Sequence, residues 1–131
     1  MAHDPMQVVF ALLDARRRRD LEAVAALLDP EVVHQGVTER LACHGREQVL
    51  ENVLGSFEHE EDGIDHLELI AAGNRVVLGL AGPRFRDVPW APLHGQIFIV
   101  HTVCHALVVH MQDHLHRADA LAEAGISPEW A

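Results

Sequence analysis

The sequence predicts an α+β fold in which helices cover one face of a strongly curved, largely antiparallel β-sheet. Two apolar β runs within residues 94–125 are separated only by a few residues around His105-Ala106, and a short Ala/Leu helix follows them. A second pair of apolar runs is joined at Gly73-Asn74, which is a tight hairpin signal. Because a hairpin alone is at best marginally stable in water, both pairs need helices to cover them.

Length and composition limit the number of domains and the kinds of partner. With 131 residues, 49% of them hydrophobic, the chain can bury one sizeable core, so we expect a single domain over residues 1–131. Twenty acidic side chains against ten Lys plus Arg give a formal net charge of −10, which repels phosphate backbones and argues against nucleic acid. The arginine run at residues 16–19 lies at the end of a helical pattern, where cations complement the helix dipole.

Targeting and redox signals predict a cytoplasmic protein with no membrane partner. No apolar run approaches the roughly 18 residues of a membrane span, and the opening residues MAHDPMQ lack the basic-then-apolar order of a signal peptide. Cys43 and Cys104 have no metal-type spacing, so we expect free thiols and no disulfide.

Three helices are expected in the first half of the chain. Asp4-Pro5 is a good helix start, and apolar residues then recur at helical spacing to about residue 18. Asp20 caps a second helix, which Asp29-Pro30 ends because proline disfavours helical geometry in the residue before it. The segment GREQVLENVLGSF at residues 45–57 has the apolar spacing of a third amphipathic helix.

Five strands are expected. Residues 31–36 are β-branched and end in glycine, residues 64–72 and 75–81 form the first hairpin, and the last two strands turn at His105-Ala106. The proline-rich loop at residues 82–93 has two interpretations. It forms the lip of a site, or it is an irregular connection that packs Trp90 into a satellite cluster.

Several segments together resemble one known family. They are ARRRRDLEAVAALLDPEVVHQG, GREQVLENVLGSF, LELIAAGNRVVLGL and VVHMQDHLHRADALAEAG, which cover nearly the whole chain. In this order they are similar to the SnoaL-like branch of the nuclear transport factor 2-like superfamily. The resemblance implies a cone-shaped α+β barrel of the cystatin-like type. Its helices pack on the concave face of a mixed, mostly antiparallel sheet and enclose a pocket, usually in a dimer.

The resemblance also implies a range of activities. Family members include polyketide cyclases, ketosteroid isomerases, limonene epoxide hydrolases and scytalone dehydratase, as well as proteins with no known reaction. This chain contains no tyrosine, so the phenol donors of ketosteroid isomerase and scytalone dehydratase are missing. We therefore disfavour those two activities as those residues perform them, and function has to be argued from the site itself.

The last hairpin supplies the candidate catalytic aspartate. A two-residue turn at its centre fixes three cross-strand pairs on the pocket face: Phe98 with Asp113, Val100 with Met111, and Thr102 with Val109. An aspartate among apolar neighbours suits proton transfer near neutral pH. The resemblance places Asp113 at the acid or base position of SnoaL-like cyclases. The alternative is that Asp113 caps the closing helix or pairs with Arg117.

His34 is the second candidate catalytic residue. It lies on the first predicted strand, where the resemblance places a pocket-lining side chain, and it could orient or protonate a substrate oxygen opposite Asp113. A half-buried, hydrogen-bonded structural histidine is the alternative. The side chains expected to line an apolar substrate pocket are Phe10, Phe57, Trp90, Phe98, Val100, Val109 and Met111.

The same register predicts a convex face for the last two strands. Its apolar and histidine residues include Ile97, Ile99, His101, Val108 and His110. We interpret this stripe as a homodimer interface, since exposed apolar sheet faces normally mark interfaces. A metal site and plain surface are the alternatives, but no metal is expected because strand spacing alone does not bring further ligands close. A one-residue slip in register would exchange the two faces.

Two functional hypotheses follow. The first is a small enzyme that acts on a hydrophobic, carbonyl- or hydroxyl-bearing molecule as an isomerase, cyclase, lyase or hydrolase. It would use general acid–base catalysis by Asp113 and His34, without a cofactor. The second is a non-catalytic ligand-binding or dimerisation domain of the same fold, in which Asp113 is paired or solvated and the pocket is filled by its own side chains.

Overall fold

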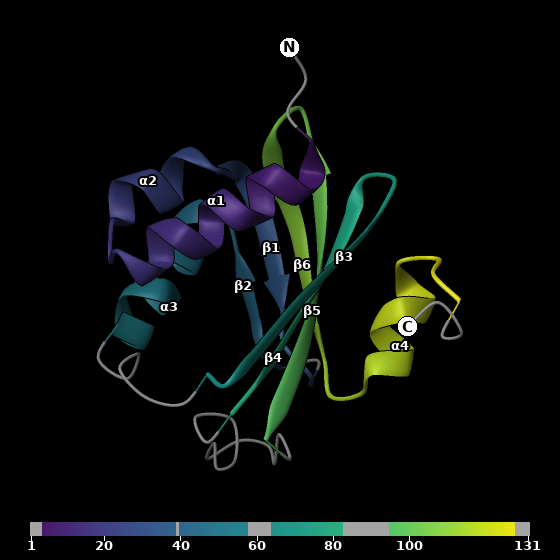
Figure 1. Ribbon diagram of the computed structural model, residues 1–131. Coiled ribbons are helices and arrows are strands. Elements are labelled where there is room, and N and C mark those ends of the chain that lie inside the picture. Colours follow the sequence, from purple (N-terminus) through teal and green to yellow (C-terminus); the bar gives the residue numbers. More distant parts are fainter. Residues whose placement is uncertain (1–3, 39, 58–63, 83–94, 128–131) are drawn as a thin grey trace.

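The computed structural model describes residues 4–38, 40–57, 64–82 and 95–127 (Figure 1). Its helices are α1 (Pro5–Arg17), α2 (Leu21–Ala26), α3 (Arg46–Ser56) and α4 (Arg117–Glu123). Its strands are β1 (Leu28–Gln35), β2 (Ala42–His44), β3 (His66–Ala72), β4 (Arg75–Ala81), β5 (Gln96–Cys104) and β6 (Leu107–His114). They form one sheet in the order β2-β1-β6-β5-β4-β3, where β1 and β6 are parallel and the other neighbours antiparallel. The predicted α+β class with a mostly antiparallel sheet is confirmed.

Helices lie on both sides of this sheet (Figure 1). α1, α2 and α3 cover one face, which we call the inner face, and α4 lies against the opposite, outer face. The inner core joins Val9, Val24 and Val49 of the first three helices to sheet residues such as Val76 and Leu78. The prediction that helices cover one face is therefore right for α1–α3 and wrong for α4.

Apolar packing and three polar contacts hold α4 on the outer face. Its buried residues pack against Val77, Phe98 and Val100 of the sheet. The polar contacts are a bidentate pair from Arg117 to Glu68 at 2.6 and 3.2 Å, a 2.7 Å contact between His114 Nε2 and Glu123 Oε1, and a hydrogen bond from Arg75 to the carbonyl of Glu123. These contacts are made at both ends of the helix, so its position does not depend on apolar burial alone.

The start of the chain follows its local signals, with two differences. The side chains of Asp4 and Asp20 each accept a backbone N–H in the first turn of α1 and α2, at 3.0 and 3.1 Å, as predicted. β1 begins at Leu28, earlier than expected, because Pro30 favours extended geometry in the residue before it and Leu28 pairs with β6. Residues 42–44, which are not among the five predicted strands, form the short edge strand β2.

The last hairpin turns where predicted but continues in a different register. His105 and Ala106 have φ values of +53° and +64°, both positive as in a two-residue type I′ turn. The first pairs beyond the turn are in the expected register, but Thr102 then pairs with His110. Val109 is thus an extra residue in β6, which is a β-bulge.

This bulge exchanges the two faces of β5 relative to β6. Asp113 lies opposite Ile99 and not opposite Phe98, and Phe98 and Val100 point outward beneath α4. Four residues predicted for the convex dimer face instead lie on the inner face: Ile97, Ile99, His101 and Val108. Of that set His110 alone points outward, so the predicted interface is wrong in its residues, and homodimerisation itself stays a prediction.

A substitution at Gly79 on β4 tests how tightly the outer face is packed. A Cβ at this position would lie 3.0 Å from Cε2 of Phe98 and 3.0 Å from Cγ of Glu68. Phe98 is buried and Glu68 is held by Arg117, so neither side chain moves freely. We expect Gly79→Ala to lower the free energy of unfolding by about 1–2 kcal/mol in urea denaturation.

Gly55 in α3 is the control for that substitution. No described atom lies within 4 Å of a Cβ built there, and alanine is the better helix former. Gly55→Ala should therefore leave stability unchanged or raise it by up to about 1 kcal/mol. Equal effects of the two substitutions would contradict the packing of Phe98 across Gly79.

Candidate functional site

One row of side chains crosses the inner face from β2 to β5. Cys43 pairs with His34, His34 with Met111, and Met111 with His101 in the register of the sheet. Because paired residues of neighbouring strands point to the same face, these four side chains lie side by side. Asp113 is two residues beyond Met111 on β6 and therefore lies on the same face.

His34 and Asp113 form the polar centre of this row. Nε2 of His34 lies 2.7 Å from Oδ1 of Asp113, and the two side chains are 16% and 15% exposed. The structure thus brings both predicted catalytic residues together, from the neighbouring strands β1 and β6. The alternative roles of Asp113 are not seen: the residue before α4 is His116, and Arg117 pairs with Glu68.

His101 is the buried end of the row and was not among the predicted site residues. It is 3% exposed, and its Nδ1 has no hydrogen-bond partner in the described part of the chain. Burial lowers the pKa of His101 to about 3, and the nearby His34 and Arg16 act in the same direction, while hydrogen bonding to the backbone of Ile99 and Val76 raises it only in part. The ring is therefore uncharged at neutral pH. In the observed register His101 pairs with Met111. Alternation along β5 would have placed His101 on the inner face if this register had been known.

Cys43 lies at the other end of the row, beside His34. Burial raises the pKa of the Cys43 thiol, and the carboxylates of Asp113 and Glu51 raise it further. The thiolate, which is the nucleophilic form, is thus disfavoured. The row offers an acid–base pair and neutral hydrogen-bonding groups, and thiolate chemistry is not favoured.

The predicted pocket residues divide between the two faces. Met111 belongs to the inner row, and Phe57 at the end of α3 packs against the inner core. Val109 is the bulge residue, which the β5 pairing skips. Phe10 is 62% exposed on α1, which contradicts its predicted place in a pocket, because other residues of α1 occupy the buried side of the helix.

Phe98 and Val100 were predicted to line the pocket and do not. Both are buried on the outer face, where they pack against α4, because the bulge in β6 reverses the direction of β5 side chains relative to Asp113. The predicted role of Trp90 lies outside the described residues.

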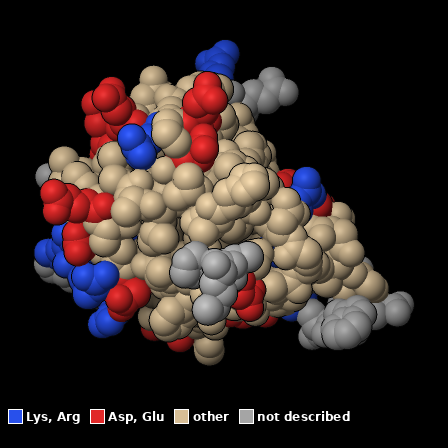
Figure 2. Space-filling model, turned by 90° about the horizontal axis from the view of Figure 1, so that it is seen from above, with Lys and Arg blue, Asp and Glu red and all other residues tan. Residues whose placement is uncertain are grey.

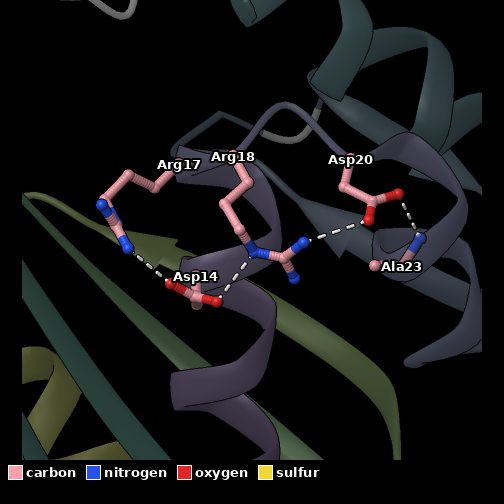
Figure 3. Close-up of polar contacts among 5 residues, drawn as sticks. All are labelled: Asp14, Arg17, Arg18, Asp20 and Ala23. Carbon is pink, nitrogen blue, oxygen red and sulfur yellow. Dashed lines mark hydrogen bonds and ion pairs between the residues drawn. The ribbon is translucent and has the colours of Figure 1, made fainter.

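Two of the four arginines at the end of α1 form ion pairs with nearby aspartates (Figure 3). Asp14 accepts hydrogen bonds from Arg17 at 2.7 Å and from Arg18 at 2.9 Å, and Arg18 also bonds to Asp20 at 3.1 Å. The hydrogen bonds from Arg17 and Arg18 hold the pKa of Asp14 below its usual range. Seen from above, blue and red residues lie interspersed around the edge of the molecule (Figure 2). The contacts of Arg17 and Arg18, whose side chains are 78% and 49% exposed, support the interpretation as a solvated helix end.

The described residues contain neither a membrane-spanning helix nor a metal cluster. No helix within them is both long and apolar enough to cross a bilayer. They also bring no three His, Cys, Asp or Glu side chains together in a way that could hold a metal ion. His101 and His110, which were predicted to share one face, are divided, with His101 on the inner face and His110 on the outer face.

Solved structures match this architecture, although no family model and no curated protein matches the sequence. A candidate polyketide cyclase from Sinorhizobium meliloti superposes with a TM-score of 0.63 at 15% identity, covering 86% of this chain and 100% of the other. An NTF2-like protein from Burkholderia xenovorans gives a TM-score of 0.65 at 16% identity, covering 95% and 97% of the two chains. This chain has the nuclear transport factor 2-like (NTF2-like) fold. A candidate ketosteroid isomerase from Kribbella flavida shares the NTF2-like fold with a TM-score of 0.60 at 18% identity, over 83% of this chain and 75% of the other.

The buried, uncharged state of His101 predicts a pH dependence of stability. In the unfolded chain a histidine takes up a proton near its ordinary pKa of 6.5, whereas the pKa of folded His101 is about 3. The unfolded state therefore binds one more proton between these values, so stability falls as the pH decreases from about 6.5 toward 3. Full titration corresponds to roughly 5 kcal/mol.

Urea unfolding of wild type and His101→Phe at about pH 7, 5 and 4 measures this contribution. The variant should lose this part of the pH dependence. It should also be at least as stable as wild type near neutral pH, because it removes an unpartnered buried nitrogen. His114→Gln on the outer face is the control and should retain the contribution of His101. A wild-type slope in His101→Phe would contradict a buried, uncharged imidazole.

Proposed function

We propose that this protein is a cytoplasmic, cofactor-independent enzyme that moves a proton on a small hydrophobic substrate bearing a carbonyl or hydroxyl group. The observation that supports this most is the 2.7 Å contact between His34 and Asp113 on an otherwise largely apolar sheet face. Isomerisation, cyclisation, elimination and hydrolysis are the candidate reactions, because each requires a proton to be taken from one atom and delivered to another.

The pair has a chemistry that follows from its hydrogen bond. An ionised carboxylate can only accept, so a neutral His34 ring donates from Nε2 to Asp113 and keeps its lone pair on Nδ1. Nδ1 can then take a proton from the substrate, and the adjacent carboxylate stabilises the imidazolium that forms. Returning the proton to a second substrate atom completes an isomerisation, and giving it to a leaving hydroxyl completes an elimination.

The surroundings of the pair suit this chemistry. Buried apolar residues, including Met111 and Ile99, lie beside it on the inner face, which strengthens electrostatic interactions within the site. The pair itself keeps some exposure, so a substrate can reach it. The similarity in fold to a candidate polyketide cyclase and a candidate ketosteroid isomerase agrees with small-molecule chemistry, although the absence of tyrosine argues against a phenol-dependent route.

Deuterium exchange next to a carbonyl group tests the proposal without knowledge of the natural substrate. The probe is 2-tetralone, an apolar ketone with acidic α-protons, dissolved in heavy water and followed by proton NMR. We expect the wild-type protein to accelerate exchange over buffer. Asp113→Asn and His34→Gln should each lower this acceleration by about a hundredfold or more, because each removes one member of the proton-transferring pair.

The outer face offers a matched control for these variants. Nε2 of His114 also lies 2.7 Å from a carboxylate oxygen, Oε1 of Glu123, with side-chain exposures of 20% and 29%. His114→Gln and Glu123→Gln remove the same kind of contact on the other face and should keep full exchange activity. An equal loss in both pairs would contradict a catalytic role for the inner one. No acceleration by the wild type would favour the non-catalytic ligand-binding alternative.

A further inference from the structure

The mechanism proposed above gives His101 no role, although the sheet places it in line with the acid–base pair. His101 and His34 are separated by two strand spacings, so their backbones are about 10 Å apart, and Met111 lies between them. All three side chains point to the inner face. The path along the sheet from the His34–Asp113 pair to His101 therefore runs across Met111, which is itself buried in the inner core.

The protein itself gives the ring no complete set of partners. The cross-strand neighbours of His101 are Val76 and Met111, whose side chains are apolar and buried. The ring interacts with the backbone of Ile99 and Val76, but its Nδ1 has no hydrogen-bond partner within the described residues. A buried polar atom without a partner lowers the stability of the ligand-free protein, and an apolar side chain of similar size would pack here without that cost. A polar group on a ligand would supply the missing hydrogen bond.

We propose that His101 is a second ligand-binding residue of the inner face, which hydrogen-bonds the far polar group of a neutral ligand whose apolar body lies over Met111. This inference rests on the proposed function. It narrows the substrate class to compact, neutral molecules that carry a hydroxyl or carbonyl group at each end of an apolar frame.

The charges around the ring favour a neutral group at this end. Burial keeps the imidazole uncharged, so the ring offers a donor or an acceptor but no positive charge for an anion. His34 and Arg16 are the charged or titratable groups that act on it, and Arg16 is hydrogen-bonded to Ser56 at 3.4 Å. A ligand carboxylate would in addition meet Asp113 on the same face and a net charge of −10 on the whole chain.

Two fluorescent probes that differ by one hydroxyl group test the inference. They are 2-naphthol and 2,6-dihydroxynaphthalene, titrated into wild type, His101→Phe and His101→Gln. The two equivalent ends of the diol give a twofold statistical advantage, and one further hydrogen bond should bring the total to roughly 3- to 10-fold tighter binding by wild type. His101→Phe should reduce the advantage to the statistical factor, while His101→Gln, which keeps a polar group, should restore part of it.

The outcomes separate this inference from the proposed function. Equal loss of affinity for both probes in His101→Phe, or an unchanged preference for the diol, would overturn the role of His101 and leave the exchange activity of His34 and Asp113 intact. Failure of both probes to bind wild type would also overturn it, and the 2-tetralone assay would still decide the proposed function independently. If wild type shows no exchange activity but binds the diol more tightly than 2-naphthol, the protein is a ligand-binding protein and the proposed enzymatic function is wrong.

A measurement on the wild-type protein tests the inference without depending on the folding of the variants. With nitrogen-15-labelled histidine, saturating diol should move the ring-nitrogen resonances of His101, whereas 2-naphthol should move mainly those of His34. Resonances of His101 that do not move at saturation with the diol would overturn the inference. His114 on the outer face serves as the internal reference and should not respond to either probe.

Discussion

A single extra residue in β6 determines which side chains meet inside this protein. Because strand side chains alternate with a period of two, the bulge at Val109 turns every residue of β5 beyond it to the other face relative to β6. Without it, Phe98 would point inward beside Asp113 and His101 would point outward. With it, Phe98 packs across Gly79 beneath α4, and an imidazole occupies the inner face. The candidate site and the packing of α4 therefore depend on the same irregularity.

Features that depend on a few neighbouring residues could be predicted from the sequence. The caps at Asp4 and Asp20 and the turn at Gly73-Asn74 lie where local chemistry placed them. The turn at His105-Ala106 lies where the two apolar runs separate, although it lacks the glycine that a type I′ turn prefers. Features set by contacts between distant segments could not. β2 is three residues long and exists because it pairs with β1, and α4 lies on the outer face because its ends contact residues of β3, β4 and β6.

Some residues of the candidate site could likewise be predicted from the sequence and others could not. His34 and Asp113 could be predicted because their contact joins β1 and β6 directly and does not pass through β5, so the register error did not reach it. His101 could not be predicted, because a bulge formed by valine carries no sequence signal that distinguishes it from an ordinary strand. The same error explains Phe98 and Val100, which the correct register moves to the outer face.

The site also couples function to completion of the fold. His34 and Asp113 are 79 residues apart in the sequence and meet across the parallel pairing of β1 and β6, which can form only after the intervening chain has crossed over. The apolar inner core around them, with Leu28 and Leu78 fully buried, supplies the stability of this arrangement. His101 lies in that core with an unpartnered nitrogen, which lowers the free energy of unfolding. His114 on the outer face has Glu123 as a partner and does not carry this cost. Stability and ligand recognition thus oppose each other at His101, which is the expected condition of a buried polar group whose partner is a ligand.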